Sequence, residues 1–342
     1  MTLPISPPLE PMLAKLQPEM PEGDGWRYEP KWDGFRAIVF RDRGRVHIGS
    51  RGRRPLHRYF PELLDPLQRA FKVPCVVDGE IVVATKGRLD FDALQLRLHP
   101  ADSRVRMLAK QTPATFVAFD LLAEGSTDLR DRPLSERFAR LERLMGKAQS
   151  AKRAMRTILA PATSIVLTPW TTDPREARVW FEQFESAGLD GLIAKHDELT
   201  YQPGNRAMTK VKHRRTIECV VGGYRLAKDG DGVGSLLLGL YDSDGVLHFV
   251  GHTSSFSAAQ RRELLLRMKP MHGGESFGEG RAPGGPSRWT QAEKEWTPVE
   301  PSLVCEVSYD QLQSGERFRH AATFLRWRPD RDPSDCMFPE QD

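Results

Sequence analysis

The sequence predicts an α+β protein in which a mixed segment of strands and helices is followed by an all-β barrel. Up to about residue 212, β-branched and aromatic runs alternate with stretches of helical pattern. From Ile217 onward, short apolar runs separated by turn residues replace this mixture. A chain of 342 residues is long enough for two domains, each with a core of its own.

Two runs in the first segment predict buried strands. "VPCVVDGEIVVA" covers residues 73–84, and "ATFVAFDLLA" covers residues 114–123. Both are rich in β-branched or aromatic residues and are bounded by turn residues. We therefore expect both strands in the interior of the first domain.

Two helices are expected further along this segment. One follows Pro133 through "LSERFARLERLMG", residues 134–146. The other begins with Asp173 as N-cap and Pro174 in the first helical position, and Gly188 is expected just past its end.

The second segment has the pattern of a small barrel. Its apolar runs cover residues 217–227, 234–253 and 302–311. The "DSDG" of residues 242–245 predicts a hairpin, residues 257–269 predict one amphipathic helix, and the Gly/Pro-rich residues 275–289 predict an exposed loop. Five or so strands with one inserted helix suit an oligonucleotide/oligosaccharide-binding (OB) fold.

Composition excludes several classes of protein. Apolar residues make up 39% and charged residues 28%, as in a soluble globular protein. No run of about 18 apolar residues indicates a membrane span, and the N-terminus lacks a secretory pattern, so we expect a cytoplasmic protein with no membrane partner. The four cysteines, Cys75, Cys219, Cys305 and Cys336, form no CxxC pair and are expected to be reduced thiols.

Basic residues are clustered, although the net charge of +4 is modest. Residues 41–58 contain seven arginines and one aspartate, and residues 210–215 read "KVKHRR". Such clusters suit a phosphate-rich ligand, because each neutralised phosphate releases counterions. A solvated basic face is the alternative for either cluster taken alone.

The stretch "YEPKWDGFRA", residues 28–37, holds a candidate nucleophile, Lys31. An amine attacks phosphorus only when it is deprotonated, so a nucleophilic lysine needs nearby cations or a bound metal. The attack also needs positive charge around the phosphates and a carboxylate for Mg²⁺.

Later residues supply groups of these kinds. Asp78-Gly79-Glu80 is expected at a strand end, and Asp190 precedes a glycine. Lys210 and Lys212 lie two apart, so both side chains face the same side of a strand and can point at one polyphosphate.

Seven short motifs in this order resemble those of the covalent nucleotidyltransferases. They are "KWDGFR", "SRGRR", "VVDGEIV", "FVAFDLL", "DGLIAK", "KVK" and "FLRWRPDR", similar to motifs I, Ia, III, IIIa, IV, V and VI. The superfamily contains ATP-dependent DNA ligases, some RNA ligases and mRNA capping enzymes. "EPMLA", "YQPGNR" and "FRHAATFLRWRP" are most similar to small bacterial ligases of the ligase C type of actinobacteria.

The resemblance implies a domain plan and an activity. A nucleotidyltransferase (adenylation) domain would occupy residues 1–214, and an OB-fold domain would occupy residues 215–342. The implied enzyme is an ATP-dependent DNA ligase that seals 5′-phosphate/3′-hydroxyl nicks in duplex DNA through lysyl-AMP and adenylated DNA. Repair polymerases or primases are implied partners, and a monomer is expected.

The resemblance also implies a role for each matching residue. Lys31 would form the lysyl-AMP, and Asp190 with Glu80 would hold Mg²⁺ or Mn²⁺. The residues implied in binding ATP are Glu29 at the adenine edge, Phe119 on the base, Arg36 and Glu80 at the ribose, Arg51 at the nucleotide or the DNA 5′-phosphate, Lys195, Lys210 and Lys212 among the nucleotide contacts, and Arg328 with Asp330 at the pyrophosphate.

Three positions depart from the usual ligase motifs. Motif IV usually has glutamate where this chain has Asp190, which is one methylene shorter. Met208 stands where a tryptophan is common before motif V, and Arg331 replaces the last lysine of motif VI. The metal preference and the pyrophosphate contacts therefore stay open.

Two other functions are alternatives. A capping-type guanylyltransferase or an RNA ligase shares the lysine chemistry, and Glu29 is able to accept from guanine as well as from adenine. A non-catalytic OB-fold protein that binds nucleic acid would explain the basic clusters, but it leaves Lys31 and the other motif residues unexplained.

Overall fold

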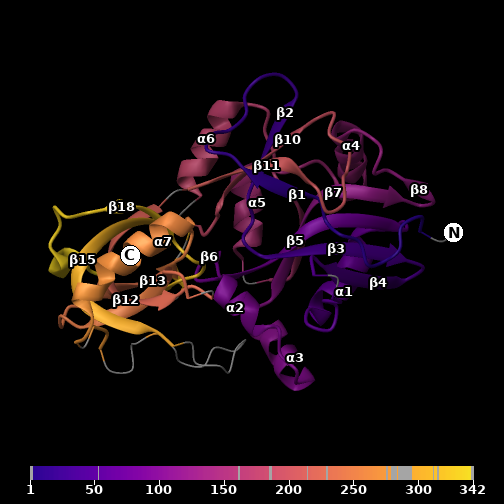
Figure 1. Cartoon of the computed structure of the whole chain (residues 1–342). Coiled ribbons are helices and arrows are strands. Elements are labelled where there is room, and N and C mark those ends of the chain that lie inside the picture. Colours follow the sequence, from indigo (N-terminus) through magenta and orange to yellow (C-terminus); the bar gives the residue numbers. More distant parts are fainter. Residues whose placement is uncertain are drawn as a thin grey trace. The chain divides into compact units, whose positions relative to one another are not determined.

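The computed structural model, shown in Figure 1, divides into two compact units, Met1–Lys212 and His213–Asp342. It describes residues 3–339 except 53, 161, 185–186, 214, 229, 275, 279–282, 284–294, 311 and 314–315. Each unit is described by itself.

The larger sheet of the first unit has the strand order β4-β3-β5-β7-β8. These strands are β3 (Phe35–Asp42), β4 (Arg45–Ser50), β5 (Cys75–Thr85), β7 (Ala114–Glu124) and β8 (Thr127–Asp128). Two short strands join it, β6 (Arg88–Leu89) against β5 and β9 (Ser164–Leu167), which runs parallel to β7. β5 and β7, the two strands predicted from apolar runs, are confirmed and lie at its centre.

The smaller sheet of the first unit has the order β1-β11-β10-β2. Its strands are β1 (Leu13–Leu16), β2 (Trp26–Pro30), β10 (Gly191–His196) and β11 (Arg206–Lys212). β1 pairs with β11 in parallel, and the other two pairs are antiparallel. This sheet places the chain after β2 beside the start of β10.

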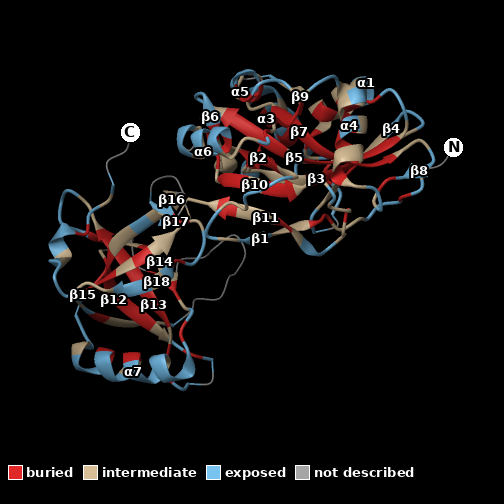
Figure 2. Ribbon diagram, turned by 90° about the horizontal axis from the view of Figure 1, so that it is seen from above, coloured by how far each residue is buried: buried red, intermediate tan, exposed pale blue. Residues whose placement is uncertain are grey.

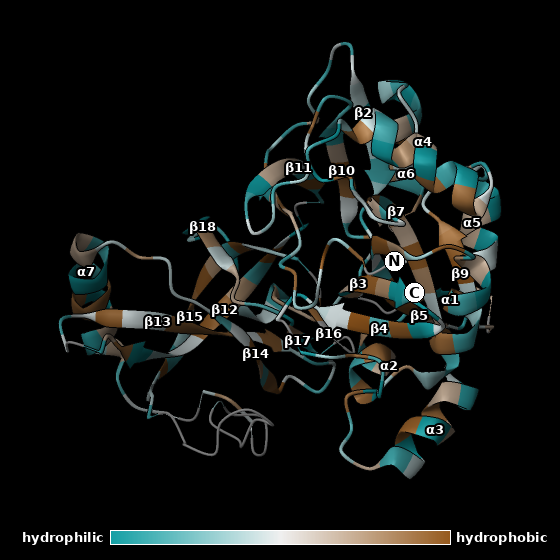
Figure 3. Cartoon of the chain, turned by 90° about the vertical axis from the view of Figure 1, so that its right-hand side faces the viewer, coloured by the Kyte–Doolittle hydropathy of each residue, from teal (hydrophilic) through white to brown (hydrophobic). Residues whose placement is uncertain are grey.

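Helices cover the sheets of the first unit. They are η1 (Pro61–Leu63), α1 (Leu64–Ala70), α2 (Phe91–Leu96), α3 (Asp102–Gln111), α4 (Leu134–Met145), α5 (Ala151–Ile158) and α6 (Pro174–Gln183). α4 confirms the helix expected after Pro133, and Figure 3 shows hydrophilic residues on its face toward the viewer.

The N-terminus of α6 is as predicted, but its C-terminus is not. The Asp173 side chain accepts a hydrogen bond from the backbone N–H of Arg175, and Pro174 occupies the first helical position. The helix ends at Gln183, five positions before Gly188. Beyond the helix, the Ala187 carbonyl accepts a backbone hydrogen bond from Leu89 of β6, and Gly188 has φ +86°.

Asp78, Gly79 and Glu80 lie in the middle of β5, so their expected place at a strand end is wrong. β5 pairs with β3 on one side and β7 on the other over most of its length. An added Cβ on Gly79 would lie 2.3 Å from the ring of Phe116 and 2.5 Å from the Val117 carbonyl oxygen. The absence of a side chain at Gly79 thus lets β7 pack closely against β5. The neighbouring Asp78 and Glu80 belong to a strand that is paired on both sides.

The second unit is built on a sheet of order β14-β13-β12-β15-β18. Its elements are β12 (Arg215–Leu226), β13 (Val233–Tyr241), β14 (Leu247–Thr253), α7 (Ala258–Met268), η2 (Lys269–Met271), β15 (Thr297–Tyr309), β16 (Leu312–Gln313), β17 (Arg317–Phe318), β18 (Thr323–Trp327) and η3 (Pro333–Asp335). The predicted hairpin at residues 242–245 joins β13 to β14, and the predicted helix begins at Ser257 with a capping box.

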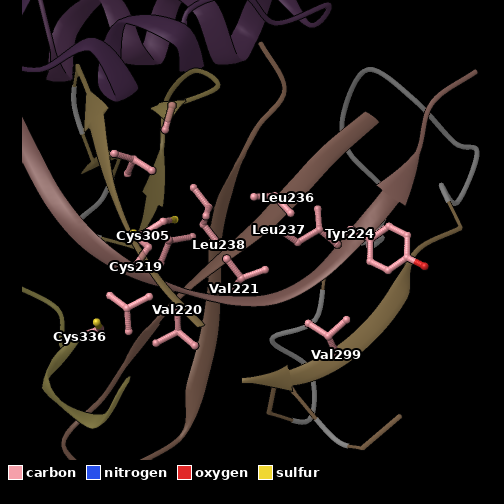
Figure 4. Close-up of a cluster of buried hydrophobic side chains, with 14 of the residues drawn as sticks. Cys219, Val220, Val221, Tyr224, Leu236, Leu237, Leu238, Val299, Cys305 and Cys336 are labelled. Carbon is pink, nitrogen blue, oxygen red and sulfur yellow. The ribbon is translucent and has the colours of Figure 1, made fainter. Parts of the chain in front are cut away.

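Each unit has its own core. Figure 2 shows buried residues along the central strands of the larger sheet of the first unit and of the sheet of the second unit, with exposed residues on α7. Figure 4 shows the core of the second unit, where Cys219, Cys305 and Cys336 lie among valine and leucine side chains. All four cysteines are free thiols, as expected. The predicted loop 275–289 lies mostly outside the described residues. Of its described residues, 276–278 and 283, Ser276, Phe277 and Pro283 are buried, so the expected exposure is wrong there.

Within the part of the chain that the structure describes, no helix has the length and apolar character needed to cross a membrane.

Candidate active site

Lys31 follows β2 directly and is fixed to the start of β10. Its backbone N–H donates to the Gly191 carbonyl at 2.9 Å, and its carbonyl accepts from the Asp190 N–H at 3.3 Å. Gly191 has φ +136°, and a Cβ there would lie 2.0 Å from the Val211 carbonyl oxygen. Only glycine therefore fits after Asp190, and the two hydrogen bonds hold Lys31 beside it.

One carboxylate oxygen joins Lys31 to a second lysine. Asp190 Oδ2 lies 2.6 Å from Lys31 Nζ and 2.7 Å from Lys212 Nζ. Burial raises the pKa of the Asp190 carboxyl, but the charges of Lys31 and Lys212 outweigh this, so the net pKa lies below its ordinary value. Asp190 is therefore an ionised carboxylate within ion-pair distance of two lysine side chains.

Lys210 adds a third positive charge. Burial lowers the pKa of its ammonium group, and the charges of Lys212 and Lys31 lower it further. No described carboxylate lies within ion-pair distance of Lys210, and Asp190 pairs with Lys31 and Lys212 only, so the three lysines outnumber the carboxylate that pairs with them. This excess of positive charge suits a polyphosphate.

A second lysine-carboxylate pair is fully buried. Lys195 Nζ donates to both carboxylate oxygens of Glu29, at 2.9 and 2.8 Å. The same ammonium lies 3.4 Å from the Phe119 carbonyl oxygen and 4.7 Å from the centroid of the Phe119 ring. Burial raises the pKa of Glu29, and Lys195 opposes this rise. Lys195 thus connects Glu29 to Phe119.

Arg36 is clamped by Asp78 over the ring of Phe119. Its Nε and Nη2 donate to the two Asp78 oxygens at 2.7 Å each, and Nη2 also reaches the Met12 carbonyl at 3.2 Å. Its guanidinium carbon lies 4.4 Å from the Phe119 centroid. Tyr201 Oη donates to Asp78 Oδ2 at 2.7 Å and so completes the cluster.

Glu80 lies directly opposite Arg36 in the β3–β5 ladder. Burial raises the pKa of its carboxyl to about 7, and the charges of Arg36 and Lys31 limit the rise. Among the described residues, no hydrogen bond or ion pair holds this carboxylate. It is therefore available to a ligand, and it titrates near neutral pH.

One expected site residue of the first unit lies apart from this cluster, and another belongs to the second unit. Arg51 is exposed just after β4. Arg328 belongs to the second unit, where it contacts Asp330 at 2.7 Å, Glu218 at close range and Glu306 at 3.9 Å. The hydrogen bonds to Asp330 are the largest cause that raises the pKa of Arg328, and they lower the pKa of Asp330 to about 2.

Three residues hold these groups through contacts that the sequence did not indicate. Asp78 and Tyr201 occur inside the quoted "VVDGEIV" and "YQPGNR", but their contact joins positions 123 apart. Glu218 pairs with Arg328 and, at 3.0 Å, with Arg331. It has no sequence signal, because only the pairing of β12 with β15 and of β15 with β18 places it there.

Two family models match the chain. Residues 11–212 match the model described as ATP dependent DNA ligase domain, and residues 229–331 match the model described as ATP dependent DNA ligase C terminal region. Together they span most of both units.

Individual proteins agree with these matches. DNA ligase C1 of Mycolicibacterium smegmatis is 49% identical over 352 residues, which cover 100% of this chain and 96% of that protein. Multifunctional non-homologous end joining DNA repair protein LigD of Mycobacterium tuberculosis is 31% identical, over 91% of this chain and 37% of that protein. A solved structure of a Lig E DNA ligase is 19% identical, with a TM-score of 0.55 over 93% of this chain and 99% of that chain, and it supports the fold alone.

The match to both models and the identity over the whole chain confirm the resemblance seen in the motifs. The chain therefore belongs to the ATP-dependent DNA ligase family, with a nucleotidyltransferase fold followed by an OB fold.

Proposed function

We propose that this protein seals 5′-phosphate/3′-hydroxyl nicks in duplex DNA with ATP, through lysyl-AMP and adenylated DNA. The observation that carries the proposal is the contact of Lys31 Nζ with Asp190 Oδ2 at 2.6 Å, beside Lys210 and Lys212. A lysine held among cations at a carboxylate is the arrangement that attack on a nucleotide phosphorus needs. The match of residues 11–212 to the ligase model supports the same assignment.

Lys31 would act as the nucleophile in the first step. Its neutral Nζ forms a bond to the α-phosphorus of ATP, the bond from that phosphorus to the pyrophosphate oxygen breaks, and the Nζ proton is released to solvent. Asp190 orients Nζ before the attack. Lys210 and Lys212 offset the negative charge of the phosphates.

The buried cluster would bind the nucleoside. Glu29 accepts hydrogen bonds from the adenine edge while Lys195 holds its carboxylate in place. Phe119 offers its ring to the base, and Arg36 with Glu80 contacts the ribose. Phe119 is 6% exposed, so the base must take part of the ring surface that Arg36 and Lys195 now share.

The carboxylates fit a divalent cation. Mg²⁺ is usually held by one or two carboxylates together with substrate phosphates, and the described residues contain no cluster of three or more His, Cys, Asp or Glu. We propose that Asp190 and Glu80 hold Mg²⁺ or Mn²⁺, which would withdraw charge from the phosphates. Glu80 suits this role because no described cation is paired with its carboxylate.

The remaining expected residues would act on DNA and pyrophosphate. Arg51 and the basic stretch at 41–58 would contact the phosphate backbone of nicked DNA, independently of base sequence. Arg328 with Asp330 would orient the pyrophosphate from the OB-fold domain. We place the boundary between a domain at 1–214 and a domain at 215–342.

We further propose a cellular setting. The protein would work as a monomer in the cytoplasm on repair nicks, with a separate polymerase or primase as partner. The LigD relative named as an end-joining repair protein supports a role in repair.

The test is labelling of the purified protein with α-labelled ATP or α-labelled GTP, in Mg²⁺ or Mn²⁺, before and after addition of nicked DNA. ATP should leave label on the denatured protein, and nicked DNA should discharge it. Lys31→Ala should abolish the label, because no other amine occupies its position. Lys15→Ala, which removes an exposed lysine from β1, is the matched control and should retain the label.

Three outcomes would contradict the proposal. Full ligation by Lys31→Ala would refute the mechanism. Label from GTP alone would assign the protein to the guanylyltransferase class, and no label from either nucleotide would leave only nucleic-acid binding.

A further inference from the structure

We propose that Tyr201 is a positioning residue for ATP, which acts through Asp78 to aim Arg36 at the ribose. The inference rests on the proposed function, in which Arg36 contacts the ribose. Tyr201 itself does not touch the nucleotide in this proposal.

The Tyr201 hydroxyl is used as both donor and acceptor. It donates to Asp78 Oδ2 at 2.7 Å and accepts from the Met12 N–H at 3.0 Å. Tyr201 is 3% exposed and Asp78 is 0% exposed, so water does not replace these bonds. A buried and fully used hydroxyl fixes its partners more firmly than an exposed one.

Asp78 in turn determines which N–H donor of Arg36 stays free for a ligand. Its two oxygens take Nε and Nη2 of Arg36, and the Met12 carbonyl takes Nη2 a second time. Nη1 makes no hydrogen bond among the described residues. A bidentate carboxylate fixes the plane of the guanidinium group, so the direction of Nη1 follows from the position of Asp78.

The same hydroxyl connects the two sheets of the first unit. Asp78 lies on β5 of the larger sheet, whereas Met12 precedes β1 and Tyr201 lies between β10 and β11 of the smaller sheet. The backbone of Lys31 is hydrogen-bonded to Asp190 and Gly191 at the start of β10 in that smaller sheet. Tyr201 therefore links the sheet that holds the nucleophile to the strand that carries Glu80 and Asp78.

Removal of one hydroxyl tests this link. Tyr201→Phe keeps the ring and loses both hydrogen bonds, so the carboxylate of Asp78 and the plane of Arg36 are less restrained. Tyr28→Phe is the matched control, because Tyr28 is 1% exposed and its hydroxyl donates at 2.7 Å to the Pro21 carbonyl instead of to Asp78. Both variants lose one tyrosine hydroxyl and its hydrogen bond.

The measurement is kcat and KM for formation of the protein-AMP adduct with ATP, 2′-deoxyATP and 3′-deoxyATP. For Tyr201→Phe we expect KM for ATP to rise about tenfold with kcat within about twofold, a change on the scale of one hydrogen bond to a charged group. The preference for ATP over at least one deoxy analogue should fall by a similar factor. Tyr28→Phe should keep the wild-type preference.

The outcomes separate this inference from the proposed function. An unchanged preference in Tyr201→Phe, or an equal loss with all three nucleotides, would overturn the positioning role. Absence of adduct in the wild-type protein would instead refute the proposed function.

Discussion

The carboxyl group of Glu80 makes the stability of this protein depend on pH. Burial raises its pKa from 4.5 to about 7, although Arg36 and Lys31 oppose the rise. Above pH 4.5 the unfolded chain loses this proton, whereas the folded protein keeps it until about pH 7. The contribution of Glu80 to the free energy of unfolding therefore falls as the pH rises through this window and is lowest above pH 7.

Glu80→Gln removes this dependence, because an amide is neutral at every pH. The pKa difference corresponds to about 3 kcal/mol, and we expect about 2 kcal/mol because the side chain is partly exposed to solvent. The variant should thus exceed the wild type in stability at pH 8. At pH 5 most of this difference should be absent.

The assay is urea unfolding at pH 5 and pH 8, followed by hydrogen exchange of peptides that cover β5. This readout reports the first unit separately from the second, which a single two-state fit does not. Glu182→Gln, an exposed carboxylate at the end of α6, is the matched control and should show no such difference. A Glu80→Gln protein that is no more stable than wild type at pH 8 would refute the reasoning.

Glu80 should also affect catalysis. The profile of kcat/KM for ATP reports groups of the free enzyme, so the wild type should show a rise through about pH 7 as Glu80 ionises. Glu80→Gln should have lower activity and lack this limb. If kcat/KM of the variant still rises at the same pH, the rise belongs to another ionisable group.

Three further predictions concern the active site, the first core and the second unit. Asp190→Asn should reduce lysine adenylation at least ~10-fold, with a changed dependence on metal concentration, because Lys31 loses an ionised partner; labelling at the wild-type rate would contradict this. Gly79→Ala should lower the free energy of unfolding by about 2 kcal/mol, because its Cβ overlaps the ring of Phe116, and an unchanged thermal midpoint would show that β7 yields. Arg328→Ala should reduce adenylation more than sealing of a pre-adenylated nick, and equal losses in the two assays would exclude a pyrophosphate role.

The sequence by itself determined several strands, helices and turns of the fold, and it contains the motifs that indicate the family. The strands at β5 and β7, the N-terminus of α6, the helix α7 and the hairpin at residues 242–245 depend on neighbouring residues, because propensity and turn chemistry act over a few positions. The order of the motifs likewise identified Lys31 as the candidate nucleophile, and this role stays a prediction.

The tertiary structure alone decided which side chains meet. Lys31 contacts Asp190 across 159 positions, and Tyr201 contacts Asp78 across 123 positions. Local pattern does not specify such pairs, because they depend on the register of strands that come from distant parts of the chain. For the same reason, the place of Glu80 inside β5, which raises its pKa, became apparent only once β5 was paired on both sides.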